Sequence, residues 1–346
     1  MTFFAKNWEN LIPCLSGFLG KTALIVTDTA VAGLFLPDVA AVLSPHFAIS
    51  THIVPEGELS KNFAELEKLL TACFQAGLNR KSLLIALGGG MVGDLAGFAA
   101  SIYMRGIQYI NLPTTLLAQA DSSIGGKTGV DFCGIKNLVG SFFKPAAVYA
   151  NLATLAALPD IQYISGLAEV IKYGIIQDVD LFYSIWNKRN LLAKRDLDAL
   201  EGALRTCCAI KTRITEQDER DTGLRQILNY GHTFGHAIES ICDFGLPHGH
   251  CVALGMVCAA AYSHNEGAMS QENFDKICAI LDFFSLPVKL PTEYRLSPRA
   301  ILDMMHSDKK ASKGDITLII SDVIGSAEIR PNADKAAILA AIETIL

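Results

Sequence analysis

Short apolar runs and helical periodicity alternate along the first 150 residues of the chain. The run that ends at Asp28 and the run that enters the glycine triplet at Gly88 have the continuous apolar character of buried parallel strands. Between them, Phe63, Leu66 and Leu70 recur on one side of a predicted helix. The strands are expected at residues 23–27, 47–54, 83–87 and 108–112, and the helix at residues 63–76. This order predicts a parallel sheet covered by helices.

From about residue 152 the apolar positions mostly recur at helical spacing. Helices are expected at residues 161–176, 197–215, 223–241, 250–266, 271–284 and 334–346, with one strand at 316–320. The chain therefore predicts two domains. Residues 1–150 should form an α/β nucleotide-binding domain with a parallel sheet, and residues 151–346 a mainly α-helical domain.

Composition and charge exclude several classes of protein. The chain is 51% hydrophobic and 18% charged, as in a compact globular protein, and its formal net charge of −6 comes without a block of basic residues. A nucleic-acid surface is therefore not expected. No apolar stretch reaches the roughly 18 to 20 residues of a membrane span. The nine cysteines include no Cys-x-x-Cys pair, which argues against a disulfide framework and favours a cytoplasmic protein.

A glycine-rich segment, Gly88-Gly-Gly-Met-Val-Gly-Asp94, follows a predicted strand and should open a helix. Glycines let a phosphate approach the backbone, and a helix N-terminus favours its charge. The competing interpretation is tight packing of the helix on the strand. Asp28, Glu56 and Glu58 follow the first two strands and are placed to hold a ribose hydroxyl, although each could also be a solvated loop acid.

A polar segment from Pro113 to Thr128 concentrates hydroxyls, glycines, one acid (Asp121) and one lysine (Lys127). The stretch Gly134-Ile-Lys-Asn137, with Lys136, follows it. Hydroxyl, amide and ammonium groups are what a phosphate or carboxylate ligand requires. The alternative is a surface loop in which Asp121 and Ser122 cap a helix.

The strongest chemical signal is a pair of histidines, His232 and His236, spaced to share one face of a helix. His248 begins the next predicted helix. Glu169 is an acid inside an otherwise apolar helix, with Lys172 one turn on. Two histidines and one carboxylate are a set that holds a catalytic zinc and leaves one position open. The residues alone leave open which three are ligands. Arg225 and Lys211 lie nearby in the sequence, and Lys309 and Lys310 form a later basic pair. A solvated charged face would also explain Lys211 and the Lys309–Lys310 pair.

These motifs in this order resemble the 3-dehydroquinate synthase family. The resemblance runs from about Glu56 to Lys310 and is carried by Pro55-Glu-Gly-Glu-Leu-Ser-Lys61, the glycine segment, Tyr103-Met-Arg-Gly106, Asp121-Ser-Ser-Ile-Gly-Gly-Lys127, Gly166-Leu-Ala-Glu-Val-Ile-Lys172, Asn229-Tyr-Gly-His-Thr-Phe-Gly-His236 and His248-Gly249. It implies a lyase that converts 3-deoxy-D-arabino-heptulosonate 7-phosphate to 3-dehydroquinate and phosphate. The cofactors implied are NAD and a zinc ion, with cobalt as a substitute.

The resemblance also implies roles for individual residues. It assigns the metal to Glu169, His232 and His248. It places around the sugar-phosphate substrate Asp121, Lys127, Asn137, Lys172, Lys211, Arg225, Asn229, His236 and one of Lys309 and Lys310. Arg105 would reach the phosphate site of a second subunit, which implies a homodimer. The expected cofactor site comprises Asp28, Glu56, Glu58, Lys61, Gly89, Gly90, Met91, Val92, Gly93, Asp94, Thr114, Thr115, Lys127, Lys136, Thr154 and Ala157.

Three positions depart from the family pattern. Ala157 stands where threonine is common, Asp221 replaces a common glutamate, and His250 stands where glutamate is usual and competes with His248 as a ligand. Other sugar-phosphate cyclases, such as 2-deoxy-scyllo-inosose synthase or a valiolone-type synthase, are alternatives. More distant ones are a metal-dependent polyol dehydrogenase of the glycerol dehydrogenase type and a non-catalytic homologue.

Overall fold

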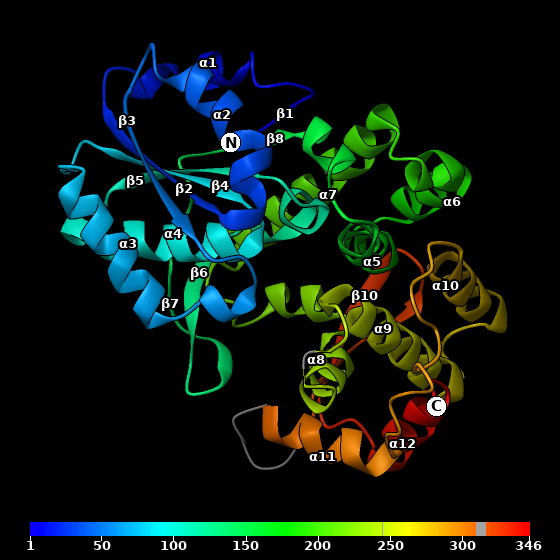
Figure 1. Cartoon of the computed structure of the whole chain (residues 1–346). Coiled ribbons are helices and arrows are strands. Elements are labelled where there is room, and N and C mark those ends of the chain that lie inside the picture. Colours follow the sequence, from blue (N-terminus) through cyan, green and yellow to red (C-terminus); the bar gives the residue numbers. More distant parts are fainter. Residues whose placement is uncertain (244, 309–315) are drawn as a thin grey trace. The chain divides into compact units, whose positions relative to one another are not determined.

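The computed structural model describes residues 1–243, 245–308 and 316–346. It divides into two compact units, Met1–Leu158 and Pro159–Leu346 (Figure 1). The first unit is α/β and the second is mostly helical, which confirms the predicted fold class. None of the helices in the described part of the chain combines the length and apolar character needed to cross a bilayer.

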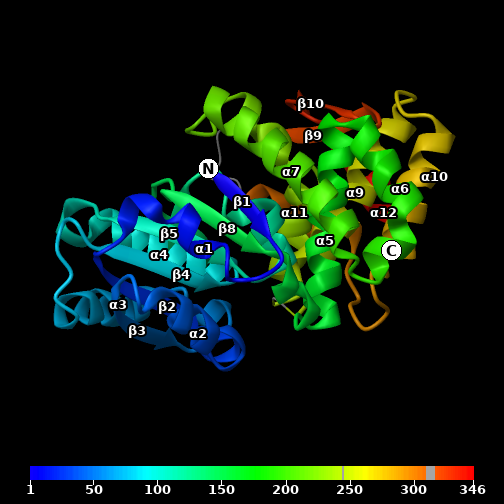
Figure 2. The same cartoon turned by 90° about the horizontal axis from the view of Figure 1, so that it is seen from above.

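The first unit is built on a six-stranded sheet in the order β1-β8-β5-β4-β2-β3, in which every pairing is parallel (Figure 2). Its elements are β1 (Thr2–Ala5), α1 (Leu11–Cys14), β2 (Thr22–Asp28), α2 (Thr29–Leu43), β3 (Ala48–Val54), α3 (Phe63–Gln75), β4 (Leu83–Gly88), α4 (Gly90–Ile102), β5 (Gln108–Pro113) and β8 (Ala147–Asn151). Short 3₁₀ turns lie at η1 (Ser16–Phe18), η2 (Glu58–Ser60), η3 (Tyr103–Arg105) and η5 (Leu152–Ala156).

Alternate strand residues face opposite layers of this sheet. Leu24 and Leu84 pack with α3 and α4 on one face, whereas Ala23 and Leu83 pack with α1 and α2 on the other. Both faces of the central strands are therefore covered, which explains why β2 and β4 read as continuous apolar runs.

The polar segment after β5 is structured, so the alternative of a surface loop is wrong. It contains a π-helical turn, η4 (Ala118–Ser122), and then an antiparallel hairpin of β6 (Lys127–Phe132) and β7 (Ile135–Phe142). Gly129 and Gly140 face each other across the hairpin, and a Cβ added to Gly140 would lie 2.0 Å from the carbonyl oxygen of Thr128. Glycine is thus required for the strands to approach.

The second unit packs helices around α9. Its elements are α5 (Asp160–Gln177), α6 (Val179–Ala193), α7 (Leu197–Gln217), η6 (Leu224–Asn229), α8 (His232–Ile241), α9 (His248–Asn265), α10 (Gln271–Phe283), α11 (Pro298–Asp308), β9 (Leu318–Val323), β10 (Ser326–Arg330) and α12 (Lys335–Glu343). Strands β9 and β10 form a two-stranded antiparallel sheet.

The single helix expected over residues 223–241 is wrong. The 3₁₀ turn η6 ends at Asn229, and Gly231 breaks the chain with a φ of 76° before α8 begins at His232. Because apolar residues continue at helical spacing on both sides of the break, the periodicity of the sequence does not reveal it. The break makes His232 the first residue of α8, and His236 lies one turn further along the same helix.

Candidate functional site

A buried carboxylate and two histidines form the centre of the second unit. Glu169 on α5 is 1% exposed, and its Oε1 lies 3.4 Å from Nε2 of His232 and 3.8 Å from Nε2 of His248. Lys172, one turn along α5 and also buried, forms an ion pair with Oε2 of the same carboxylate. Three charged or titratable side chains, one each from α5, α8 and α9, therefore meet at Glu169, and the spacing in the sequence predicts this for Lys172.

The surroundings separate the protonation of these groups. Burial opposes a charge on Glu169, but Lys172 and His232 hold the pKa of its carboxyl well below the usual range. Burial and the charge of Lys172 lower the pKa of His232 to about 4, so its ring is neutral near pH 7. Burial alone would lower the pKa of His248, but hydrogen bonds to the carboxylates of Glu169 and Glu239 outweigh it and raise this pKa to about 9. The proton on His248 is the charge that a bound cation would displace.

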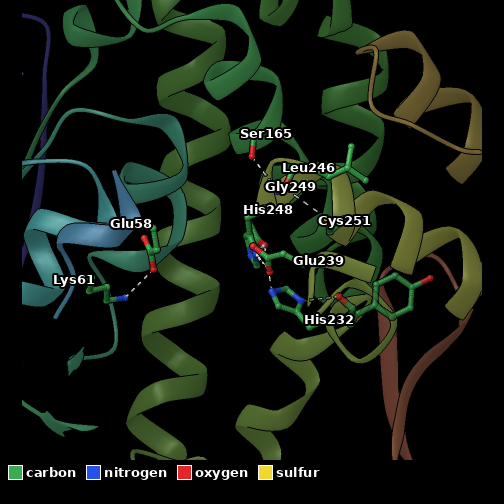
Figure 3. A network of polar contacts seen from close by, with 11 residues as sticks. Glu58, Lys61, Ser165, His232, Glu239, Leu246, His248, Gly249 and Cys251 are labelled. Atoms are coloured by element: carbon green, nitrogen blue, oxygen red, sulfur yellow. Dashed lines mark hydrogen bonds and ion pairs between the residues drawn. The ribbon is translucent and has the colours of Figure 1, made fainter. Parts of the chain in front are cut away.

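Each of the two histidines is held through its other ring nitrogen. The Nδ1 of His232 is hydrogen-bonded to the backbone carbonyl of Tyr230 at 3.1 Å. The Nδ1 of His248 contacts Oε2 of Glu239 at 3.4 Å, and Figure 3 shows these side chains together. Because Nδ1 is occupied in both rings, both Nε2 atoms face Glu169.

Backbone contacts set the spacing of the helices that carry these side chains. A Cβ on Gly249 would lie 2.0 Å from the carbonyl oxygen of Ser165, and the Gly249 amide donates to the Ser165 hydroxyl at 2.9 Å (Figure 3). A Cβ on Gly255 would lie 1.9 Å from the carbonyl oxygen of Gly231. The start of α9 therefore meets α5, and its middle meets the start of α8, at main-chain distance.

The donor set fits a divalent metal. Ligand atoms of Glu169, His232 and His248 all lie within 4.8 Å of one another, as do those of His236, Glu239 and His248. Both oxygens of Glu169 are buried: Oε2 pairs with the ammonium group of Lys172, and Oε1 faces the rings of His232 and His248. One carboxylate and two imidazoles are suitable zinc ligands. His250 belongs to neither group in the described chain, and burial lowers its pKa.

Further polar residues expected near a substrate also belong to this unit. Lys211 on α7 is 7% exposed and Arg225 on η6 is 3% exposed, an unusual degree of burial for cations. The guanidinium of Arg225 donates to the carbonyl of Glu219 at 2.7 Å, which fixes its position. His236 has its ring centroid 5.3 Å from that of His232 and 5.9 Å from that of His248, whereas Asn229 is exposed. Lys309 and Lys310 lie outside the described residues.

In the first unit, Lys61 is the centre of a second polar cluster. Lys61 is 3% exposed. Its Nζ donates to Oδ2 of Asp94 at 2.6 Å and to Oδ1 of Asn137. The carboxylate of Glu58 lies 3.7 Å from the same Nζ (Figure 3). Burial opposes the charge, but Asp94 and Glu58 raise the pKa of Lys61. The backbone amide of Asn137 donates to Asp131 at 2.7 Å. Three expected cofactor and substrate residues thus share one ammonium group.

The glycine segment serves tight packing as well as helix initiation. A Cβ on Gly88 would lie 2.7 Å from Val92, and one on Gly93 would lie 2.8 Å from the Asn111 amide. The packing interpretation is therefore confirmed at these two positions. Gly90 is the first residue of α4, whose N-terminus offers backbone amides to an anion.

The other expected cofactor residues differ in their surroundings. Asp28 is a buried N-cap of α2, its Oδ1 accepting from the amide of Val31 at 2.8 Å, so the alternative of a solvated acid is wrong. Glu56 and Ala157 are exposed, and Met91, Thr115 and Lys136 are half-buried. Lys127 and Arg105 are also exposed. Asp121 lies within the π-helical turn and is not an N-cap.

Sequence reasoning missed a buried amide beside this group. The Nε2 of Gln119, a fully buried residue, donates to the carbonyls of Pro113 and Asn151 at 3.0 and 3.1 Å and to Oγ1 of Thr154 at 3.2 Å. Gln119 therefore joins the ends of β5 and β8 to the turn that carries Thr154. Its position among Leu116, Leu117 and two alanines was the available signal, because an amide in an apolar run requires partners.

Comparisons with known proteins cover most of the chain. Residues 51–165 match the family model for the 3-dehydroquinate synthase N-terminal domain, and residues 166–311 match that for its C-terminal domain. The chain is 44% identical over 326 residues to a 3-dehydroquinate synthase of Desulforamulus reducens, covering 94% of this chain and 90% of the relative.

Two solved structures share the fold over the full length. The 2-epi-5-epi-valiolone synthase of Streptomyces hygroscopicus, solved with NAD+ and Zn2+, is 25% identical, with a TM-score of 0.92 over 100% of this chain and 96% of that one. A 2-deoxy-scyllo-inosose synthase solved with carbaglucose-6-phosphate, NAD+ and Co2+ is 24% identical, with a TM-score of 0.90 over the same shares. The matched motifs and the identity across both units together show that this chain belongs to the 3-dehydroquinate synthase family.

Proposed function

We propose that this chain converts 3-deoxy-D-arabino-heptulosonate 7-phosphate to 3-dehydroquinate and phosphate, using NAD and a divalent metal ion. The observation that carries the proposal is the meeting of Glu169, His232 and His248 in a chain of this family. The three donors suit zinc, with cobalt as a substitute, and leave a coordination position for a substrate hydroxyl.

The bound groups would supply two kinds of chemistry. A metal ion lowers the pKa of a coordinated hydroxyl, and NAD accepts a hydride and returns it. Oxidation of one substrate carbon makes the neighbouring proton acidic, so that phosphate can leave. Reduction of that carbon, ring opening and aldol closure follow, and NADH is not released.

The residues of the second unit would hold the substrate and its charges. Lys172 offsets the charge of Glu169, and Lys211 and Arg225 present buried cations suited to a carboxylate. We assign His236 to the phosphate end, where an imidazole can hold or move a proton. Asn229 and one of Lys309 and Lys310 would complete this group.

The residues of the first unit would hold NAD. The start of α4, from Gly90 to Asp94, is a suitable place for the pyrophosphate, because the free backbone amides of a helix N-terminus favour an anion. Glu58, Thr114, Thr115 and Lys136 are the expected neighbours. Lys61 would act chiefly through Asp94 and Asn137, which its buried ammonium group holds. We assign Asp121, Lys127 and Asn137 to the substrate.

A homodimer and a cytoplasmic location belong to the same proposal. Met104 and Arg105 both have positive φ angles, 53° and 67°, and both are exposed. Backbone strain of this kind is found where a side chain is presented for a function, and presentation to a second subunit is one such function. All nine cysteines are free and lie in described regions, as suits a reducing compartment.

The test is incubation of the purified chain with NAD, zinc and the heptulosonate phosphate. The expected result is equimolar dehydroquinate and phosphate without accumulated NADH. Steady NADH formation from glycerol would instead identify a polyol dehydrogenase. Cyclisation of a hexose phosphate, in place of the heptulosonate, would identify another sugar-phosphate cyclase.

A further inference from the structure

The two histidines that face Glu169 are oriented by different kinds of acceptor. His232 is held at Nδ1 by a neutral backbone carbonyl, that of Tyr230. His248 is held at Nδ1 by the carboxylate of Glu239, a residue of α8 that is only 4% exposed (Figure 3). A buried carboxylate is costly unless it is paired, so its presence beside His248 requires an explanation.

The geometry of the His248 ring provides one. Its Nε2 faces Oε1 of Glu169 at 3.8 Å, while its Nδ1 faces Oε2 of Glu239 at 3.4 Å. An imidazole that donates a proton from Nδ1 presents the lone pair of Nε2 to a metal. An acceptor at Nδ1 fixes the orientation of the ring and makes Nε2 a more basic ligand.

We propose that Glu239 is a positioning residue, which orients His248 toward the metal and is not itself a ligand. The inference rests on the proposed metal site of Glu169, His232 and His248. The competing role is direct ligation, because His236, Glu239 and His248 form a second group of donors within 4.8 Å. Positioning is favoured because an ion beside Glu169 uses Nε2 of His248 and leaves Nδ1 to Glu239, so both carboxylates are satisfied at once.

The helices that carry this contact are rigidly joined. Glu239 follows His232 by seven residues on α8, so the two lie on the same side of that helix. Backbone contact between Gly231 and Gly255 fixes α8 against α9, and contact between Ser165 and Gly249 fixes α9 against α5. The backbone that carries His248 therefore has little freedom to move. Loss of the Glu239 carboxylate should change the orientation of the His248 ring more than the position of α9.

The experiment measures Co2+ affinity of the full chain, stripped of metal, by competition with a chromophoric chelator. Glu239→Leu removes the acceptor and should weaken binding by roughly 10- to 100-fold, the usual effect of removing an outer-shell partner. Glu239→Gln keeps a neutral acceptor, so its affinity should fall between that of Glu239→Leu and that of the natural chain. At saturating Co2+ the visible spectrum of Glu239→Gln should keep the wild-type band pattern, since the ligands are unchanged. Glu272→Gln, on the exposed face of α10, is the control and should bind as the natural chain does.

A double-mutant cycle separates positioning from ligation. If Glu239 acts only through His248, Glu239→Gln should cause no further loss of affinity in a His248→Ala background. A further loss as large as in the natural background would show that Glu239 binds the ion itself and would overturn the proposal. Undiminished Co2+ binding by Glu239→Leu would also overturn it. If that variant does not fold, as judged by circular dichroism, the Gln cycle still decides.

The outcomes also distinguish this inference from the proposed function. Tight Co2+ binding that depends on Glu169, with no conversion of the heptulosonate phosphate, would refute the function and leave the cycle readable. A chain that turns over this substrate but shows equal affinity in all Glu239 variants would refute the inference alone. Failure of the natural chain to bind Co2+ would refute both.

Discussion

The ammonium group of Lys61 lies 2.6 Å from a carboxylate oxygen of Asp94, and the lysine side chain is almost completely withdrawn from solvent. The pair joins the segment after β3 to the first turns of α4, and Asn137 on β7 is bonded to the same ammonium group. One charge thus connects three parts of the first unit.

Lys61→Met should destabilise the first unit by about 3 kcal/mol, because it leaves the partners of a largely buried cation without their counter-charge. Urea unfolding followed by Trp8 fluorescence, in a Trp186→Phe background, measures this unit. Lys68→Met is the control: its pair with Glu65 spans a similar 2.7 Å but uses a lysine that is 64% exposed, and its loss should cost less than about 1 kcal/mol. Equal losses in the two variants would contradict the role of Lys61.

Removal of His232 and removal of His236 should have different effects on metal binding. Zinc at about 100 times its dissociation constant should stabilise the natural chain by about 2.7 kcal/mol, measured as a rise in the thermal midpoint. We expect His232→Ala to lose this rise, since it removes a proposed ligand. His236→Ala should keep the rise and lose turnover. Loss of the zinc response in both would mean that His236 is a ligand.

His250→Glu should leave zinc binding intact. His250 is two residues from His248 but belongs to neither group of donors in the described chain. The thermal response to zinc checks this expectation, with His248→Ala as the variant whose response should be much weaker. If His250→Glu behaves like His248→Ala, then His250 completes the site.

Gly249→Ala should be harmful because its new methyl group would meet the carbonyl oxygen of Ser165, which cannot turn aside as a side chain could. We expect a loss of about 1–3 kcal/mol from overpacking, together with weaker zinc binding as His248 moves. Gly202→Ala is the matched control, because it lies in α7 with nothing within 4 Å of the added atom. It should stabilise the chain by about 0.5–1 kcal/mol. Urea denaturation of both variants tests the contrast.

Gln119→Leu should destabilise the first unit by about 1–3 kcal/mol, because a buried amide no longer donates to Pro113 and Asn151. Under the proposed function it should also raise the KM for NAD more than it lowers kcat, since the turn that carries Thr154 loses its tie. Gln271→Leu, at the exposed start of α10, should change neither quantity. An unchanged KM with the expected loss of stability would restrict Gln119 to a structural role.

Apolar pattern was sufficient to predict β2, β4, β5 and most helices, because β2, β4, α5 and α9 are buried along nearly their whole length. It missed β6 and β7, whose glycines and polar residues interrupt the alternation of a strand. It also missed the strands β1, β8 and β10 and the helices α1, α2, α6 and α11. It also joined η6 to α8, since only the left-handed backbone of Gly231 separates them.

The candidate site was predicted in part for a similar reason. Glu169 stood out as an acid in an apolar helix, and His232 as a histidine with a partner one turn on. Glu239 did not stand out, because a glutamate near a helix end is typical of a solvated surface. Its partner His248 lies beyond a turn, and sequence spacing does not report a contact made by two helices folding back on each other.

In most pairs of packed helices, a larger side chain on one helix can be compensated during evolution by a smaller side chain on the other. Gly249 and Gly255 remove that freedom from α9, because its neighbours there are main-chain atoms and no residue is smaller than glycine. Variants that alter the metal or the substrate must therefore come from changes elsewhere around the site. For protein engineering, the side chains proposed to face the substrate are open to redesign, whereas the frame that spaces Glu169, His232 and His248 is not.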